Sequence, residues 1–233
     1  SGDIDELGAN EENRAVMMDY QGDGLWKYTM ELPASAKKFH YEYLVKSGEG
    51  IRREWGSPHS FSPGRNAGKY RLVDRWRDVP ANLPFYSSAF IQGIFFRQHA
   101  DSVVETIEQG TFTVKVDAPQ LRPDERLVMV GDCPELGDWD VLKAPLLNDS
   151  AFPEWQITLD GRQLKFPFEY KFVIVRTHQR EVVAWETGEN RICREKPQNP
   201  SEAVVVSGLR FNGGGEPGRR FRYFLSVRIM GSA

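Results

Sequence analysis

Hydrophobic residues in this chain fall in short runs, without the long 3.6-residue periodicity that is typical of amphipathic helices. The runs are rich in β-branched and aromatic residues, and clusters of Gly, Pro, Asn and Asp separate them, which is the pattern of a β-sandwich or barrel. We predict strands at residues 26–32, 39–45, 110–116, 126–130, 155–159, 168–175, 181–185 and 203–206. The sequence therefore predicts an all-β fold.

A segment without this pattern separates two strand-rich regions. It carries Pro80 and Pro84, then the apolar run FIQGIFF at residues 90–96, and then an acidic piece at residues 101–108 that could be helical. The chain has 233 residues, which suits two domains of about 100 residues each. We place an inter-domain linker at residues 79–109.

The two regions share an internal repeat, which is the first feature to seek before any fold is proposed. GDIDELG at residues 2–8 recurs as GDCPELG at residues 131–137, and a strand-opening tryptophan, Trp26 or Trp155, follows each copy. The later landmarks keep the same order, with YEY at 41–43 against FEY at 168–170 and Trp55 against Trp185. We predict two copies of one unit, at residues 1–78 and 110–211. The first copy begins midway through its motif and lacks the strands that residues 110–130 supply to the second.

Four pieces of the second copy carry a resemblance to a known family. They are VGDCPELGDWD at 130–140, Trp155, FEYKFV at 168–173 and AWETGENR at 184–191, and together they span nearly all of residues 110–210. In types and joint spacing they resemble the family 20 carbohydrate-binding modules, or starch-binding domains. The resemblance implies two tandem immunoglobulin-like antiparallel β-sandwiches that bind starch, glycogen or maltodextrin without catalysing a reaction.

The same resemblance implies the residues of the principal sugar site. Trp139 and Trp185 would form the platform, because an aromatic ring covers the apolar C–H face of glucose with little loss of entropy. Lys171 and Asn190 can donate hydrogen bonds to sugar hydroxyls, and Glu186 can accept them. Each also has a structural alternative: a core position for either tryptophan, a solvated strand face for the lysine, and a turn for the other two. Trp155 opens an alternating strand, and we expect it in the core.

The first copy departs from this pattern. Asn10 stands in the place of Trp139, Leu44 is expected opposite Lys171, and the loop after Trp55 reads GSPHSF. We therefore expect a weak or absent principal site in which only the Trp55 platform survives.

Two further aromatic residues are candidates for the family's second, more exposed site. Tyr20 lies in the loop before Trp26, and Phe152 lies in the matching loop of the second copy. The alternative for both is an ordinary surface position.

A narrower resemblance concerns the arrangement of the chain. Two such modules with an eroded first copy and the linker PANLPFYSSAFIQGIFF at residues 80–96 resemble the N-terminal region of disproportionating-type 4-α-glucanotransferases. In those proteins a family 77 glycoside hydrolase barrel follows, and such a barrel needs about 250 residues of its own. The resemblance implies a region that tethers a catalytic domain to its polymer. The alternatives are a structural or dimerisation module with little sugar affinity, and a fragment of a glycoside-processing enzyme.

The net charge bears on the kind of partner, and the number of cysteines bears on the cellular compartment. Lys plus Arg number 30 against 33 Asp plus Glu, a net charge of -3, so we expect neither nucleic acid nor an anionic membrane as a partner. No apolar run is long enough to span a bilayer. Two cysteines are too few for a disulfide scaffold and favour the cytoplasm, with a mature secreted form as the alternative.

No group of residues has the spacing of a catalytic or metal site. Asp138 and Glu186 could form a carboxylate pair, but nothing in their spacing singles them out. Cys133 occupies a turn position that Ile4 holds in the other copy, and the four histidines lack metal-ligand spacing: His40, His59, His99 and His178. We expect no catalytic residue, no metal and no cofactor.

The C-terminal tail, residues 212–233, has an uncertain role. After NGGGEPG, the stretch RRFRYFLSVRIMGSA is predicted to be a strand. It could begin a following domain, or it could replace the strands missing from the first copy, in its own chain or in a neighbour. An unfilled sheet edge favours aggregation, so we prefer the second possibility.

Overall fold

The computed structural model describes residues 1–64, 66, 68–78, 106–213 and 222–230. The predicted all-β fold is confirmed, since this part of the chain holds strands and the short 3-10 turns η1 (Asp5–Leu7), η2 (Glu12–Arg14) and η5 (Pro134–Leu136). No helix within it is long and apolar enough to span a membrane.

We refer to two modules, each named by its strands. Module one consists of β1 (Asp19–Gly22), β2 (Leu25–Leu32), β3 (Phe39–Tyr41), β4 (Leu44–Ser47), β5 (Gly50–Arg53), β6 (His59–Phe61), β7 (Gly68–Arg75) and the C-terminal β16 (Arg222–Ile229). Module two consists of β8 (Thr111–Asp117), β9 (Glu125–Gly131), β10 (Asn148–Ala151), β11 (Glu154–Asp160), β12 (Phe168–Arg176), β13 (Val182–Trp185), β14 (Arg191–Cys193) and β15 (Ala203–Arg210).

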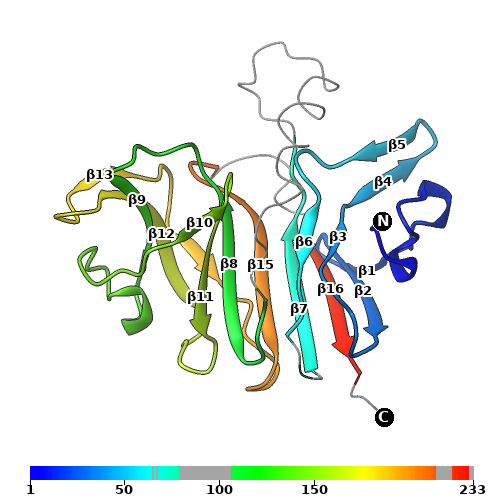
Figure 1. The fold of residues 1–233 in the computed structure, drawn as a ribbon. Coiled ribbons are helices and arrows are strands. Elements are labelled where there is room, and N and C mark those ends of the chain that lie inside the picture. Colours follow the sequence, from blue (N-terminus) through cyan, green and yellow to red (C-terminus); the bar gives the residue numbers. More distant parts are fainter. Residues whose placement is uncertain (65, 67, 79–105, 214–221, 231–233) are drawn as a thin grey trace.

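One eight-stranded sheet runs through both modules in the order β1-β2-β16-β7-β15-β8-β11-β10 (Figure 1). The modules meet where β15 pairs in parallel with β7, with Ala203 opposite Tyr70 and Val206 opposite Val73. The pairs β15–β8 and β16–β2 are also parallel, so the expectation of antiparallel sandwiches does not extend to these three pairs. The modules are therefore joined by backbone hydrogen bonds of a common sheet as well as by the chain between them.

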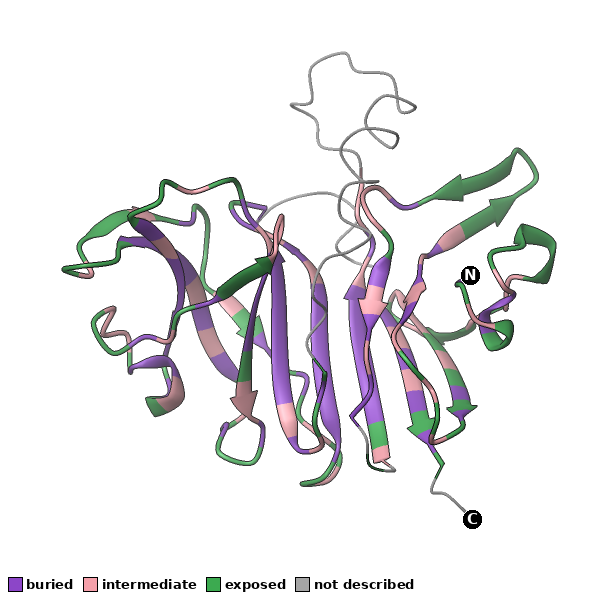
Figure 2. Cartoon of the chain, viewed as in Figure 1, coloured by how far each residue is buried: buried purple, intermediate pink, exposed green. Residues whose placement is uncertain are grey.

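The two hydrophobic cores lie on opposite faces of this sheet. Successive side chains of a strand point to opposite faces, and in β15 Val204 and Val206 join the core of module two while Ala203 and Val205 join that of module one. The strands β9, β12, β13 and β14 cover one face, and the small sheets β3–β6 and β4–β5 cover the other (Figure 1). The central strands are accordingly buried along much of their length (Figure 2), which explains the uninterrupted apolar run in β15. Trp155 lies in the core of module two, as predicted.

The tail strand β16 replaces one missing strand of module one within its own chain. It lies between β2 and β7, as β8 lies between β11 and β15 in module two. Its direction is reversed, because β16 is parallel to β2 and antiparallel to β7, whereas β8 is antiparallel to β11 and parallel to β15. The preferred hypothesis for the tail is confirmed, with a chain direction that the sequence did not indicate.

Most of the predicted linker, residues 79–105, lies outside the described residues, including the apolar run 90–96 and the start of the acidic piece. The last residues of the linker belong with module one, because Ile107 is buried in its core and the Gln109 Oε1 accepts a hydrogen bond from the Lys69 amide at 3.2 Å.

We predict that module one depends on the side chains of β16. Leu225 is only 3% exposed within the core of module one, and replacing a buried leucine by alanine costs about 2–5 kcal/mol of unfolding free energy. Leu225→Ala should therefore lower the urea midpoint strongly. Arg228→Ala, on the exposed side of the same strand, is the matched control and should change it by less than about 0.5 kcal/mol. Equal midpoints for the two variants would show that β16 does not contribute to the folded core.

Candidate functional site

The outer face of module two carries a second apolar cluster. In β12, Phe168, Tyr170 and Phe172 point into the core, while the intervening Val173 and Val175 point outward. There they form a buried cluster together with Val128 and Val130 of β9 and Ala144 of the following loop. Trp139 and Val141 pack against this cluster from the same loop. The face opposite the core is thus apolar enough to seat a large aromatic ring.

A strained turn presents the side chain of Trp139. Gly137, Asp138 and Trp139 have φ values of 82°, 50° and 64°, in the left-handed region that costs energy for residues other than glycine. Gly137 is required, because a Cβ there would lie 2.7 Å from the Asp140 oxygen. Hydrogen bonds hold the turn: the Trp139 amide donates to the Gly131 oxygen at 2.7 Å, and the Asp138 amide donates to the Cys133 oxygen at 3.1 Å. The indole is therefore fixed, half-buried, against the outer cluster.

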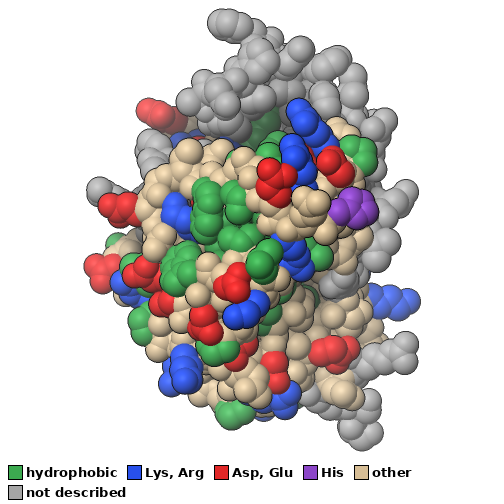
Figure 3. Space-filling view, turned by 90° about the vertical axis from the view of Figure 1, so that its left-hand side faces the viewer, with side chains coloured by type: hydrophobic (Ala, Val, Ile, Leu, Met, Phe, Trp, Pro, Cys, Tyr) green, Lys and Arg blue, Asp and Glu red, His purple; other side chains and the backbone are tan. Residues whose placement is uncertain are grey.

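Trp185 reaches the same face from another element. It ends the strand β13 and lies opposite Val173 of β12, and cross-strand neighbours share a face of the sheet. Its side chain is 43% exposed, so its predicted position on the surface, and not in the core, agrees with the structure. Figure 3 shows hydrophobic side chains gathered on this side of module two, with acidic groups around them. The two tryptophans thus border one apolar cluster on the outer face.

Lys171 and Asn190 lie beside this face with part of their hydrogen-bonding capacity in use. Lys171 belongs to the outward row of β12, and its Nζ donates to the Glu186 and Gly188 oxygens at 3.2 and 2.6 Å. An ammonium has three donors, so one can serve a ligand. Asn190 is exposed, and its Nδ2 donates to the Glu169 Oε2 at 2.9 Å. Both polar groups can donate toward a sugar on the outer face.

The prediction that Glu186 accepts hydrogen bonds from sugar is wrong. Its side chain is buried, with 3% of the residue exposed. Its carboxylate accepts from the Phe172 amide at 3.0 Å and from the Nε and NH2 nitrogens of Arg191 at 3.0 and 2.8 Å. A buried carboxylate needs such a charged partner, and Arg191, whose role the sequence pattern did not indicate, provides it. The conceivable carboxylate pair of Glu186 with Asp138 is excluded for the same reason, since Asp138 is exposed on the loop.

Module one has the same frame, by which we mean a buried glutamate that accepts a hydrogen bond from a backbone amide and pairs with an arginine. Its residues match those of module two in a different alignment from the one that the repeat predicted. The Tyr43 amide donates to Glu54 Oε1 at 3.0 Å, as the Phe172 amide does to Glu186, and Arg77 Nε binds the Glu54 carboxylate at 3.1 Å, as Arg191 binds Glu186. Glu54 is therefore the counterpart of Glu186. One residue earlier, Arg53 lies opposite Leu44 as Trp185 lies opposite Val173.

The predicted match of Trp55 with the Trp185 platform is thus wrong, and a weaker sugar contact of Trp55 stays a prediction. By this alignment Trp55 corresponds to Thr187, and its amide donates to the Arg77 oxygen at 2.8 Å. The place of Trp185 is held by Arg53. A tryptophan two positions from its expected place cannot be recognised from the repeat alone, because the loops of the two copies differ in length.

The expected pairing of Leu44 with Lys171 is also wrong. The bridge between Gly2 and Tyr41 repeats the pair between Gly131 and Tyr170, which places Glu42 at the position of Lys171. Asn10 does hold the place of Trp139: its amide donates to the Gly2 oxygen at 2.7 Å, and its φ is 63°.

A surface ion pair stands where the sugar platform would lie in module one. The guanidinium of Arg53 binds the carboxylates of Glu42 and Glu12. None of the three platform positions, now held by Asn10, Glu42 and Arg53, has an aromatic ring or an unpaired ammonium to offer. Module one thus keeps the buried glutamate–arginine pair and the left-handed turn of the site, without the two tryptophans and the lysine.

The candidates for a weaker site lie at opposite ends of the shared sheet. Tyr20 is exposed on β1, and its ring centroid lies 5.0 Å from that of Trp26. Phe152 lies half-buried in the turn between β10 and β11. They therefore cannot form one joint site, and each remains a separate prediction.

Other reactive groups are held in structural roles. Burial raises the pKa of Glu54, but His59 and Arg77 beside it lower the pKa further, to about 2. This carboxylate is therefore ionised at neutral pH and paired. Burial raises the pKa of the Cys133 thiol to about 11, which leaves little thiolate to act as a nucleophile. Within the described residues, no three His, Cys, Asp or Glu side chains are grouped to hold a metal ion.

Residues 109–204 match the family model of the starch binding domain, which covers less than half of the chain. Comparison with curated proteins gives no match.

Similar solved structures include a γ-CGTase from alkalophilic Bacillus clarkii, with 25% identity over 44% of this chain and 15% of that chain and a TM-score of 0.34. Another is the family 20 CBM of a maltotetraose-forming amylase from Pseudomonas saccharophila STB07, with 21% identity over 42% of this chain and 99% of that chain and a TM-score of 0.33. A family 15 glucoamylase from Hypocrea jecorina is 18% identical over 46% of this chain and 18% of that chain, with a TM-score of 0.35.

We predict a structural role for Glu186. The variant Glu186→Gln leaves Arg191 buried without a counter-charge, which should cost about 3 kcal/mol of unfolding free energy. Glu189→Gln, in the exposed part of the same loop, is the control and should change it by less than about 0.5 kcal/mol. An unchanged urea midpoint of Glu186→Gln together with lost affinity for maltoheptaose would instead support direct sugar contact.

Proposed function

We propose that module two binds α-1,4-glucans of the starch, glycogen or maltodextrin type without catalysing a reaction. The observation that carries the proposal is the position of Trp139 and Trp185, which border one apolar cluster on an outer face within the residues that match the starch binding domain. Two rings from separate elements can contact successive glucose residues of a curved chain. Lys171 and Asn190 supply hydrogen-bond donors beside them.

The positions of the two rings are set before a ligand binds, which favours binding. Backbone hydrogen bonds hold the turn that carries Trp139, and this reduces the entropy lost on binding. Trp185 ends an edge strand and is open to solvent. Shallow sugar platforms bury little area, so we expect a dissociation constant of about 10 µM to 1 mM, or roughly -4 to -7 kcal/mol.

Removal of either ring tests this proposal. Trp139→Ala and Trp185→Ala should each weaken maltoheptaose or β-cyclodextrin binding at least about tenfold, equal to roughly 1.4 kcal/mol, and the double variant should show no binding by isothermal titration. Trp55→Ala is the matched control, because that ring lies outside the platform, and it should bind as wild type does. Failure of the wild-type protein to bind maltoheptaose, or to be retarded in amylopectin gels, would refute the proposal.

We propose a structural role for module one. The Arg53 ion pair occupies its platform position, and its strands β7 and β16 extend the sheet of module two. The alternative function, a structural module with little sugar affinity, is thus proposed for module one alone. We propose neither a nucleic acid nor a membrane as a partner, in line with the net charge of -3.

We further propose that the chain tethers a catalytic 4-α-glucanotransferase domain to its polymer, in the cytoplasm. Support comes from the arrangement of the sequence, and the two cysteines, both free and buried, suit a reducing compartment. Tethering raises the local polymer concentration and can add roughly a hundredfold in avidity. In such an enzyme, Trp139→Ala/Trp185→Ala should reduce activity on amylopectin or glycogen much more than on maltose-sized substrates. Equal losses on both substrates would contradict tethering.

A further inference from the structure

The two rings of the proposed platform belong to separate elements. Trp139 lies on the loop at residues 137–147, here called the site loop, which is bonded at both ends to β9. The Trp139 amide donates to the Gly131 oxygen at 2.7 Å, and the Leu147 amide donates to β9 at 2.8 Å. Trp185 belongs to the β12–β13 hairpin, whose strand β13 lies at the edge of its sheet. The relative position of the rings therefore depends on contacts between the site loop and this hairpin.

The side chain of Arg180 joins the middle of the site loop to the hairpin. Arg180 lies in the turn between β12 and β13, before Trp185, and its NH1 nitrogen donates to the Ala144 oxygen at 2.6 Å. The Ala144 amide donates in turn to the Asp140 oxygen at 3.0 Å, and its methyl group is buried in the outer cluster. This contact connects the element that carries one ring with the element that carries the other.

The backbone of the hairpin turn does not explain why an arginine stands at this position. Arg180 has a φ of 53°, in the left-handed region that costs energy for residues other than glycine. The turn is closed by backbone bonds alone: the Arg180 amide donates to the Arg176 oxygen, and the Arg176 amide donates to the Glu181 oxygen, both at 2.9 Å. A glycine would make the same bonds at lower cost. What arginine adds is the side-chain bond to the site loop.

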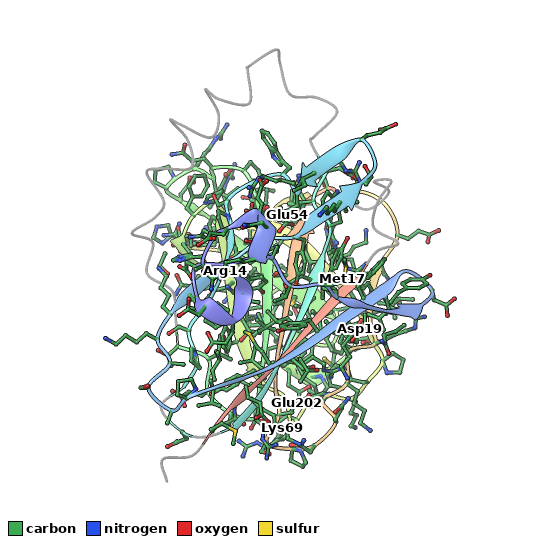
Figure 4. All side chains as sticks on the ribbon, turned by 90° about the vertical axis from the view of Figure 1, so that its right-hand side faces the viewer. Arg14, Met17, Asp19, Glu54, Lys69 and Glu202 are labelled. Atoms are coloured by element: carbon green, nitrogen blue, oxygen red, sulfur yellow. The ribbon has the colours of Figure 1, made fainter. Side chains whose placement is uncertain are left out.

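Module one joins the corresponding elements in another way. Arg53, which holds the place of Trp185, binds Glu12 of the N-terminal turns, and these turns hold the place of the site loop. The turn of its β4–β5 hairpin, residues 47–50, reads Ser-Gly-Glu-Gly and has no cation. Arg14, labelled in Figure 4 on the N-terminal turns, pairs within those turns. Module one therefore uses its platform position for the link, whereas module two makes the link from the hairpin turn.

We infer that Arg180 is a positioning residue of the sugar site, an inference that rests on the proposed function. By holding the site loop from the hairpin turn, Arg180 leaves the positions of Trp139 and Trp185 free for aromatic rings and fixes one ring relative to the other. Rings that are held in place before binding lose less freedom when one glucan chain contacts both. The effect of Arg180 on binding passes through Trp139, because the loop that Arg180 holds carries that ring.

A double-mutant cycle in the full chain tests this inference. Arg180→Gly removes the guanidinium and suits the left-handed backbone, so the melting temperature should change little. Its affinity for maltoheptaose, measured by NMR titration, should fall at least about fivefold. On the Trp139→Ala background the same change should have no further effect, since the ring that Arg180 positions is then absent. Arg176→Ala is the matched control, because this exposed arginine of the same hairpin pairs with Glu181 at 2.7 Å, and it should bind as wild type does.

A readout without sugar separates this inference from the proposed function. The amides of Lys143 and Ala144 both donate to the Asp140 oxygen at 3.0 Å, and their hydrogen exchange in the free protein should speed up at least about fivefold in Arg180→Gly. Unchanged exchange, wild-type affinity of Arg180→Gly, or an equal loss of affinity with and without Trp139 would overturn the inference. Failure of the wild-type protein to bind maltoheptaose is a different result, which refutes the proposed function itself.

Discussion

The parallel pairing of β15 with β7 is the constraint on which the rest of the structure depends. It buries both faces of β15, with Val204 on one core and Val205 on the other. On the module-one side, the Ser207 hydroxyl of β15 donates a hydrogen bond to the buried carboxylate of Asp74. The same Oγ atom lies 3.1 Å from the His59 Nδ1. Because the cores are on opposite faces of one sheet, the outer face of the second sheet of module two is turned away from module one. The two tryptophans lie on that face, where the loop of Trp139 packs against the outer cluster.

The two modules share a frame and differ in what the frame displays. Each has a left-handed turn after the GD motif. Each also has a buried glutamate, which accepts a hydrogen bond from a backbone amide and is neutralised by an arginine. These are requirements of folding, since a buried carboxylate without a partner is costly. The displayed positions are Trp139, Lys171 and Trp185 in module two, and Asn10, Glu42 and Arg53 in module one. The proposed sugar recognition by module two therefore depends on a few side chains that the shared frame does not require.

Much of the fold follows from local pattern, and much of the site does not. Strand content, the repeat and the core position of Trp155 could be predicted because they depend on alternation and spacing along the chain. The joining of β7 to β15 could not, since it pairs strands that are distant in sequence. Burial of Glu186 depends on Arg191 reaching it in space. Trp55 was misplaced by two residues of alignment in a loop, where spacing carries little information.

We propose that one face of module two, and no face of module one, holds an α-glucan chain. A crystal structure of the protein soaked with maltoheptaose tests it most directly. We expect glucose rings stacked on the indoles of Trp139 and Trp185, with a hydroxyl within hydrogen-bond distance of the Lys171 Nζ. Sugar bound beside Arg53 in module one, or a bare outer face of module two at saturating maltoheptaose, would contradict it.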